Sequence, residues 1–363
     1  MPTKKPTCPH GTEPILLAVD NFTPPSRTPW GGTKIAGRYK RALLALDARA
    51  EPSIVGESWE LSVEPDFPSR ASDGRPLPEL FSEDLRAYLG PDEAALGGAR
   101  LLVKLLDAAE PLSVQIHPSD DSPGLSKDES GKPEAWYVVE REAGAGLYVG
   151  LRDGVTESRL RQAIEAGEDV SSLFCFVPVE PGDFFVIEAG TPHAIGAGIT
   201  LVEPQRVLPG RRGITYRYWD WNRRYAVDGS ASPTGEPRPL HLREALAVTA
   251  WQAPRERALL ERIRLRAGEA LVDSAARSEV LAGPDGPIAS TDLKIARLSG
   301  TGIVELEHEP RLRGLTVVEG SITLRGDHFA VEVPAGRTAA LPAALGGVVA
   351  ELDRAHGVLS SIP

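Results

Sequence analysis

Glycine and proline recur along the whole chain, and they constrain its fold more than any other feature of the sequence. The 363 residues include 36 glycines and 32 prolines, well above average usage. Both residue types are typical of turns, and both interrupt regular helices. The short apolar runs between them therefore predict a turn-rich, mainly β fold with few and short helices.

Charge and cysteine content limit the partners and the compartment. The formal net charge of -11 disfavours nucleic acid as a partner. Cys8 and Cys175 are too few for a disulfide framework or a thiolate metal cage, which indicates a reducing compartment. No apolar stretch follows the first residues, and no run of about 18 uncharged apolar residues occurs. We therefore expect a cytoplasmic protein without a signal peptide or membrane span.

The distribution of short elements predicts three parts: a polar tail over 1–13, a first β unit with short helices over 14–254, and a second β unit over 255–363. Apolar spacing and capping residues predict helices at 78–89, 156–166 and 242–249. Strands are predicted at 101–106, 112–117, 135–140, 183–187 and 200–203 in the first unit, and at 315–318, 321–324, 330–333 and 338–341 in the second.

The segment Leu112-Ser-Val-Gln-Ile-His117 alternates strictly between apolar and polar residues. On a strand, Ser113, Gln115 and His117 therefore share one face. Three polar groups on one face are about as often a solvated surface as a site, so this pattern alone leaves both alternatives open.

A second histidine lies in a distinctive spacing. Gly182, Gly190 and His193 are spaced as in the second cupin motif, with Glu188 where that motif usually has proline. A glycine at position 190 permits a tight hairpin whose exit strand directs His193 inward. Gln115-x-His117 resembles the paired-ligand position of the first cupin motif. A lone histidine is more often structural, but two histidines at both motif positions favour a metal site.

Glu134 opens a predicted strand and supplies a candidate third ligand. Taken alone, a carboxylate here is most often a surface group. Together with two imidazoles it is an adequate ligand set for a divalent ion, and the carbonyl of Gln115 can complete it. Nitrogen and oxygen donors without thiolate suit zinc, and they do not exclude iron, manganese, cobalt or nickel.

Several segments jointly resemble the type I mannose-6-phosphate isomerase family, from about residue 15 to residue 250. These are Pro29-Trp-Gly-Gly32, Gly56-Glu-Ser-Trp-Glu60, Leu112-Ser-Val-Gln-Ile-His-Pro118, Gly131-Lys-Pro-Glu134, Gly190-Thr-Pro-His-Ala-Ile-Gly196 and Thr215-Tyr-Arg217. The resemblance is to the shorter bacterial form. It implies a zinc-dependent cupin that interconverts mannose 6-phosphate and fructose 6-phosphate through an enediolate.

The resemblance also implies roles for individual residues. His117, Glu134 and His193 would be the zinc ligands, with Gln115 as the fourth. Arg217 and Lys132 match residues of the active site that would serve catalysis and substrate binding. Ser113 occupies a position associated with the phosphate end of the substrate, and Glu203 falls where the family has a carboxylate near the sugar. The general base stays open between Glu203 and Lys132.

Two features depart from the family pattern. The connection between Glu203 and Arg217 is unusually basic, because it contains Arg206, Arg211 and Arg212. These arginines either help to bind phosphate or pair with local carboxylates. The second unit retains the Pro-x-Gly spacing of the cupin motif. Ala339, however, stands where the motif would have its ligand histidine, and His328 does not lie at that position. We therefore expect two cupin-like jelly rolls, of which the second is metal-free.

Two other functions remain as alternatives. One is the isomerisation of another, unphosphorylated sugar, and the other is a non-catalytic, sugar-sensing metal cupin. The partner expected is a phosphorylated hexose, with the chain as a monomer or weak homodimer. Retention of every candidate ligand together with Arg217 and Lys132 favours an active isomerase.

Overall fold

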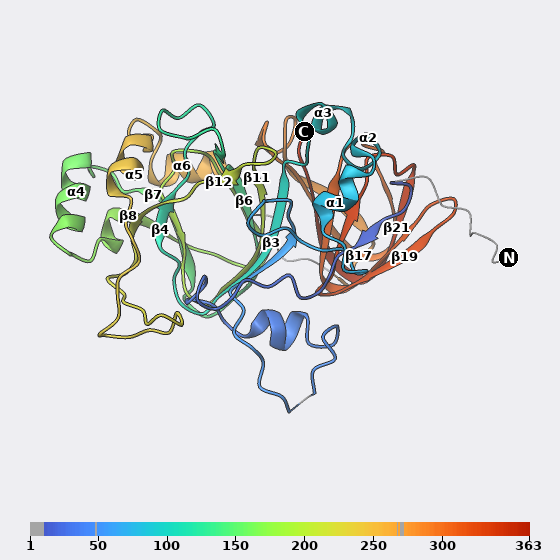
Figure 1. Ribbon diagram of the computed structural model, residues 1–363, viewed down its shortest axis with the longest axis horizontal. Helices are drawn as coiled ribbons and strands as arrows, with labels where there is room; N and C mark the ends of the chain where they lie inside the picture. The colour runs from blue at the N-terminus through green and yellow to red at the C-terminus, as the bar shows by residue number, and fades with distance from the viewer. Residues whose placement is uncertain (1–10, 48, 267, 269–271) are drawn as a thin grey trace.

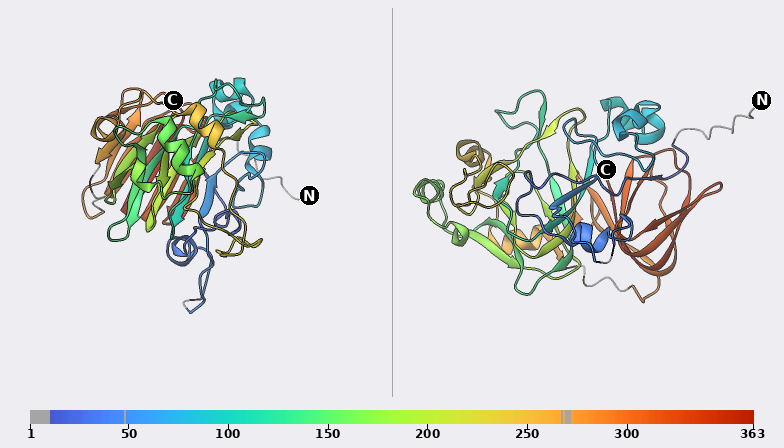
Figure 2. Two further views of the ribbon diagram at one scale, coloured as in Figure 1. Left: turned by 90° about the vertical axis from the view of Figure 1, so that its left-hand side faces the viewer. Right: turned by 60° about the horizontal axis from the view of Figure 1, so that its bottom comes forward.

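The computed structural model describes residues 11–47, 49–266, 268 and 272–363, so most of the predicted polar tail and Cys8 lie outside the described residues. The prediction of a mainly β chain with few helices is confirmed. Two groups of strands lie side by side, those of residues 57–266 from the left to the centre of Figure 1 and the C-terminal strands on the right. The right-hand view of Figure 2 shows the same arrangement.

The first group consists of two facing sheets. The order β14-β9-β6-β11-β3-β2 forms a six-stranded sheet, and the order β13-β4-β10-β7-β8 forms a five-stranded sheet. The bounds of the six-stranded sheet are β2 Glu57–Leu61, β3 Leu101–Ala108, β6 Glu134–Arg141, β9 Asp183–Ile187, β11 Ile199–Arg206 and β14 Arg264–Arg266. Those of the five-stranded sheet are β4 Val114–Ile116, β7 Gly146–Leu151, β8 Phe174–Pro178, β10 His193–Ile195 and β13 Tyr216–Trp219. The short β5 Glu129–Ser130 and β12 Arg212–Gly213 pair in parallel beside them.

The second group is one eight-stranded sheet, ordered β1-β20-β18-β21-β17-β15-β16 with β19 paired to β18. The two predicted strands at 315–318 and 321–324 are parts of a single long strand, β18. N-terminal residues 15 and 16 join this C-terminal sheet, where Ile15 pairs with Ala340. Its members are β1 Ile15–Leu16, β15 Arg277–Gly283, β16 Ile288–Ala289, β17 Lys294–Leu306, β18 Arg313–Arg325, β19 Ala330–Pro334, β20 Thr338–Leu341 and β21 Val348–Ser361.

The six-stranded sheet is buried on both faces, and strand β6 shows how. Trp136 and Val138 belong to the apolar core inside the first group. Ala135 and Tyr137 belong to the core that also contains residues of the C-terminal sheet. Because alternate residues of a strand point to opposite faces, Glu134 lies on the same face as Trp136, toward the interior of the first group.

Short helices cover the ends of the sheets: α1 Leu77–Ser82, α2 Leu85–Leu89, α3 Pro91–Leu96, α4 Glu157–Glu165, α5 Leu242–Val248 and α6 Glu256–Ile263, with the single turns η1 Ile35–Tyr39 and η2 Ser171–Leu173. Thr156 caps α4 as predicted, accepting a hydrogen bond from the Arg159 amide. The helix predicted over 78–89 is two helices, because the Asp84 side chain starts a new one by accepting from the Ala87 amide. Within the described ranges, no helix has both the length and the apolar character needed to cross a membrane.

Helix α6 was not predicted, because the sequence after 255 was interpreted as β structure throughout. Its apolar residues Leu259 and Ile263 are four positions apart and pack into the core of the first group. The spacing that identifies the helix is therefore present, but it extends over only two turns.

Candidate metal centre and adjoining cavity

Three side chains from three strands converge inside the first group. His117 follows β4, His193 begins β10 and Glu134 begins β6. The Nε2 atom of His117 lies 3.0 Å from Glu134 Oε2, and the Nε2 atom of His193 lies 3.2 Å from Glu134 Oε1. All three residues are buried, and one ligand atom from each lies within 4.8 Å of the others. The structure thus brings together the residues that the sequence proposed as metal ligands.

Hydrogen bonds at the far side of each ring determine which nitrogen carries the proton. His117 Nδ1 lies 2.9 Å from the Ile214 carbonyl oxygen, and His193 Nδ1 lies 2.8 Å from the Thr191 carbonyl oxygen. A carbonyl oxygen only accepts, so each Nδ1 carries the hydrogen and donates it. Each Nε2 therefore presents a lone pair to the carboxylate oxygens of Glu134.

Lone pairs facing one another at this distance leave buried polar atoms unsatisfied. Both Nε2 atoms and Glu134 Oε1 lack a hydrogen-bond donor within the described part of the chain. Such atoms are costly in a protein interior unless something satisfies them. A divalent cation would accept all three lone pairs at once, so the residues present fit a metal ion.

Burial keeps the two imidazoles neutral. It lowers the pKa of His117 to about 3, with a further contribution from the positive charge of Lys132. Burial also lowers the pKa of His193. For Glu134, burial alone would raise the pKa, but the two imidazoles, once protonated in acid, and Lys132 outweigh it and hold the pKa below its ordinary value. The donor set is therefore ready for a cation near neutral pH.

Two glutamines are placed to complete the ligand set. Gln115 on β4 lies opposite His193 and, on its other side, opposite Arg217. Residues directly paired across strands share a face, so these three form a row. Gln205 donates from Nε2 to Glu134 Oε2 at 2.7 Å, and its Oε1 has no partner among the described residues. The sequence singled out Gln115 as a fourth ligand and gave Gln205 no such role.

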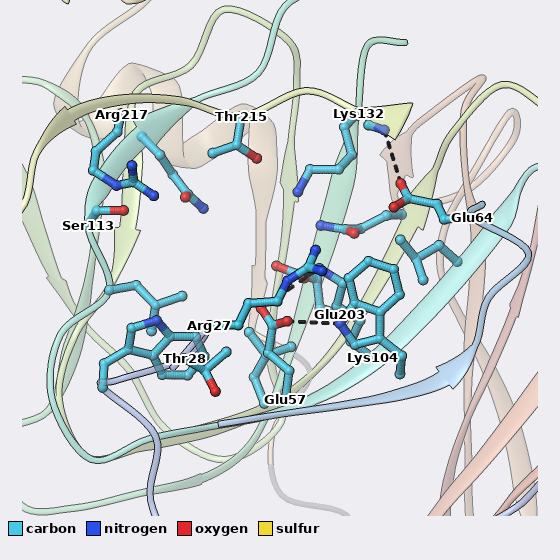
Figure 3. A pocket seen from close by; sticks show the side chains of 18 of the residues that line it. Arg27, Thr28, Glu57, Glu64, Lys104, Ser113, Lys132, Glu203, Thr215 and Arg217 are labelled. Atoms are coloured by element: carbon cyan, nitrogen blue, oxygen red, sulfur yellow. Dashed lines mark hydrogen bonds and ion pairs between the residues drawn. The ribbon is translucent and has the colours of Figure 1, made fainter. Parts of the chain in front are cut away.

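A cavity of about 200 Å³ adjoins this centre. Figure 3 shows it from close by, with Ser113 and Arg217 side by side and Lys132 beyond them. Every predicted site residue outside the three-residue centre lines this cavity, namely Ser113, Gln115, Lys132, Glu203 and Arg217. The centre and the cavity together form one site between the two sheets of the first group.

One wall of the cavity is a row of paired residues from three strands. Trp59, Lys104 and Glu203 lie opposite one another on β2, β3 and β11. Lys104 Nζ stands 4.5 Å from the centre of the Trp59 ring and 3.6 Å from Glu203 Oε2. Glu203 Oε1 accepts a hydrogen bond from Trp136 Nε1 at 2.9 Å. Burial and the nearby charge of Glu134 raise the pKa of Glu203 to about 7.

Lys104 was missed by the sequence analysis. A signal was available, because Lys104 is the one charged residue in the apolar run Leu101-Leu-Val-Lys-Leu-Leu106. A charge in the middle of a strand that is buried along its length requires a partner. Here Glu57 and Glu203 supply it, and they raise the pKa of Lys104 although burial opposes them. Arg27, Glu64 and Arg238 also line the cavity and were not predicted.

Lys132 and Arg217 are cations with few anionic partners. Lys132 is 7% exposed, and its Nζ lies 4.0 Å from Glu134 Oε2. Burial and the nearby Lys104 lower the pKa of Lys132. Arg217 donates from Nη1 to the Pro239 carbonyl oxygen at 2.8 Å, and burial together with Arg238 lowers its pKa to about 10. Both cations are therefore available to an anionic ligand.

The three arginines of the basic connection lie elsewhere. Arg206 pairs with Asp120 and Asp292, and Arg212 pairs with Asp128. Arg211 donates to the Glu129 carbonyl oxygen. None of the three lines the cavity. Of the two alternatives left by the sequence, the structure favours pairing with local groups.

The C-terminal sheet contains no comparable donor set among its described residues. Ala339 is part of its apolar core, and His328 is exposed beside Phe329. The position that would supply a ligand histidine is thus filled by a methyl group.

Comparison with known proteins relates this architecture and site to one family. Residues 26–140 match the family described as phosphomannose isomerase type I, catalytic domain. A mannose-6-phosphate isomerase from Streptococcus mutans is 34% identical over 223 residues, which are 60% of this chain and 63% of that relative. The chain therefore aligns with slightly less than two thirds of the relative's length.

Solved structures share the fold over nearly the whole chain. The mannose 6-phosphate isomerase of Bacillus subtilis matches with a TM-score of 0.71 and 24% identity, covering 96% of this chain and 99% of that one. The mannose 6-phosphate isomerase of Salmonella typhimurium, bound to fructose 6-phosphate and zinc, matches with a TM-score of 0.64 and 16% identity. That match covers 97% of this chain and 99% of the other. At these identities the similarity establishes a common architecture.

Proposed function

Since the chain belongs to the type I phosphomannose isomerase family, we propose that it is a metal-dependent aldose–ketose isomerase that interconverts mannose 6-phosphate and fructose 6-phosphate. The observation that carries this proposal is the convergence of His117, Glu134 and His193, whose unsatisfied lone pairs face one another beside a cation-lined cavity. A purely structural cluster would have satisfied these atoms with donors.

His117, Glu134 and His193 would hold the metal, with Gln115 or Gln205 as a further ligand. Zinc suits two imidazoles and a carboxylate, and zinc is bound to the related Salmonella typhimurium enzyme. When bound, the ion would stabilise the negative charge that develops on the substrate oxygens during isomerisation. The incomplete set of protein ligands leaves coordination positions for these oxygens.

Glu203 is our choice for the general base that moves the proton between adjacent sugar carbons. Its carboxylate lines the cavity, and a pKa of about 7 lets it both accept and return a proton near neutral pH. Lys132 is the alternative, since burial lowers its pKa and its ammonium lies beside the metal ligand Glu134. As a cation, Lys132 is better suited to stabilise the enediolate oxygens.

Arg217 and Ser113 are proposed to bind the phosphate end of the substrate. They lie side by side in the cavity, and Arg217 carries a buried Nε without a hydrogen-bond partner among the described residues. We further propose that residues 14–254 hold the complete site and that the C-terminal sheet serves as a metal-free packing partner. Of the predicted second unit, 255–363, α6 and β14 belong to the first group.

An activity assay tests the proposal directly. Purified protein, loaded with zinc, is given mannose 6-phosphate or free mannose, and the corresponding ketose is measured. We expect conversion of the phosphorylated sugar, loss of activity after removal of the metal by a chelator, and recovery when zinc is restored. Equal efficiency on free mannose would support the free-sugar alternative, and metal binding without turnover of either sugar would support a sensor.

A further inference from the structure

Asp220, immediately after β13, holds two arginines at one end of the cavity. Its Oδ2 accepts from Arg238 Nε at 2.7 Å, and its Oδ1 accepts from Arg238 Nη2 at 2.7 Å. The same carboxylate accepts from Arg223 Nη2 at 2.7 Å. The Asp220 side chain is 4% exposed, so these contacts are shielded from solvent. A bidentate, buried contact of this kind fixes the orientation of a guanidinium.

Arg238 is thereby fixed in the cavity wall. Its side chain is 19% exposed, and its guanidinium lies 5.5 Å from the centre of the Tyr225 ring. Asp220 occupies the edge formed by Nε and Nη2. A guanidinium has five N–H donors, of which Asp220 takes two, so Arg238 retains donors for another partner.

Arg238 and Arg217 are held close together by the backbone between them. Arg217 donates to the carbonyl oxygen of Pro239, the residue after Arg238. The His241 amide donates to the Arg217 carbonyl oxygen at 2.8 Å, so the segment that carries Arg238 is docked against β13. Both guanidinium groups line the cavity. Two like charges brought together in this way repel each other, and an anion between them would relieve the repulsion.

The distribution of charge around the cavity favours this end for an anion. Arg217, Arg223 and Arg238 face only two carboxylates, Asp220 and Glu110, and among the described residues no ion pair includes Arg217. At the wall formed by β2, β3 and β11 the charges are balanced, since Glu57 and Glu203 face Lys104 and Arg27. A phosphate dianion would therefore be attracted more strongly at the Arg217–Arg238 end than at that wall.

We propose that Arg238, oriented by Asp220, is a second phosphate-binding cation beside Arg217 and a determinant of the preference for phosphorylated over free sugar. The identity of the sugar rests on the function proposed above, but the anion-binding role of Arg238 does not. Because the phosphate takes no part in the proton transfer, Arg238 stabilises the ground state and the transition state alike. Its loss should therefore raise KM more than it lowers kcat.

The test compares Arg238→Gln with Arg224→Gln in the zinc-loaded protein. Arg224 is an exposed arginine of the same segment that donates to the Gly235 carbonyl oxygen and does not line the cavity, which makes it a matched control. Steady-state kinetics are measured with mannose 6-phosphate and with free mannose. The affinity for inorganic phosphate is measured separately by calorimetry, so that one readout is independent of turnover.

We expect Arg238→Gln to raise KM for mannose 6-phosphate and Kd for phosphate on the order of 10- to 100-fold, the loss of one charge-assisted contact. We expect kcat to change by less than about threefold, and kcat/KM for free mannose to stay as in the wild type. Arg238→Lys, which keeps the charge without the bidentate geometry, should recover part of the affinity. The control variant should match the wild type in every measurement.

Two results would overturn the inference. One is unchanged phosphate affinity in Arg238→Gln. The other is an equal loss of efficiency on phosphorylated and free sugar, which would indicate a general structural role. If the wild type binds phosphate through Arg238 but does not isomerise mannose 6-phosphate, the proposed function fails and the anion site stands.

Discussion

Replacing Glu134 by glutamine should stabilise the metal-free protein and weaken its binding of zinc. In the metal-free protein the oxygen of the new amide can accept the hydrogen bond that Gln205 now donates to Oε2 at 2.7 Å. The N–H group of that amide can then donate to His193 Nε2, at the position where Oε1 now lies 3.2 Å away. A contact between lone pairs becomes a hydrogen bond, so the free energy of unfolding should rise by about 0.5–1.5 kcal/mol.

The metal-loaded protein should respond in the opposite direction. Glutamine removes the one negative charge among the three candidate ligands, and Glu134 is fully buried. Removing one partner of a buried charge pair costs about 3–5 kcal/mol. The Kd for zinc should therefore rise by roughly 100- to 4,000-fold. Because a bound ligand stabilises the folded state by an amount that grows with the logarithm of its affinity, added zinc should raise the unfolding temperature of the variant less than that of the wild type.

The assay is zinc binding by competition with a chromophoric chelator, together with thermal unfolding with and without zinc. Glu57→Gln is a suitable control, because Glu57 is a carboxylate of the adjoining cavity that pairs with Lys104 rather than with the histidines. Its zinc affinity should change by less than about tenfold. Wild-type zinc affinity in Glu134→Gln would refute the assignment of Glu134 as a ligand. A metal-free variant less stable than the wild type by about 2 kcal/mol or more would refute the lone-pair argument.

Three further predictions concern the base, the C-terminal unit and a buried histidine. If Glu203, whose pKa is about 7, is the base, kcat/KM should fall as the pH drops below about 7, and Glu203→Gln should lower kcat at least about 100-fold while the zinc content stays unchanged. His328→Ala should leave zinc content and turnover as in the wild type, and a large loss of zinc would show that the C-terminal unit holds a ligand. Burial, with the nearby Arg297, lowers the pKa of His356 from 6.5 to about 3, so the unfolded chain binds one more proton than the folded chain in that window. The free energy of unfolding should therefore be highest above pH 6.5 and decrease as the pH falls toward 3, and His356→Gln should make the decrease shallower in denaturation experiments across this range.

The sequence alone was sufficient for the fold class and for the candidate ligands. Strict alternation over 112–117 put Gln115 and His117 on one strand face, and Gly190 correctly marked the tight turn before His193. The predicted hairpin was wrong, because β9 and β10 on the two sides of this turn belong to different sheets and do not pair. These features are local, since a strand of period two and a tight turn are determined by residues adjacent in the chain. The ligand types, imidazole and carboxylate, are also read directly from the residues.

Only the tertiary structure decided how charge is arranged around the cavity. Lys104 acquires its role because β3 lies between β2 and β11, which brings Glu57 and Glu203 to it from positions 47 residues before and 99 residues after. Arg206 looked like a candidate phosphate ligand, but Asp120 and Asp292 neutralise it. Strand order and register determine such pairings, and no local periodicity encodes them, because a pairing between distant strands depends on the packing of the whole sheet. The order of residues along the chain therefore predicts a metal site in a β fold, whereas the charge at each end of its cavity is a property of the folded molecule.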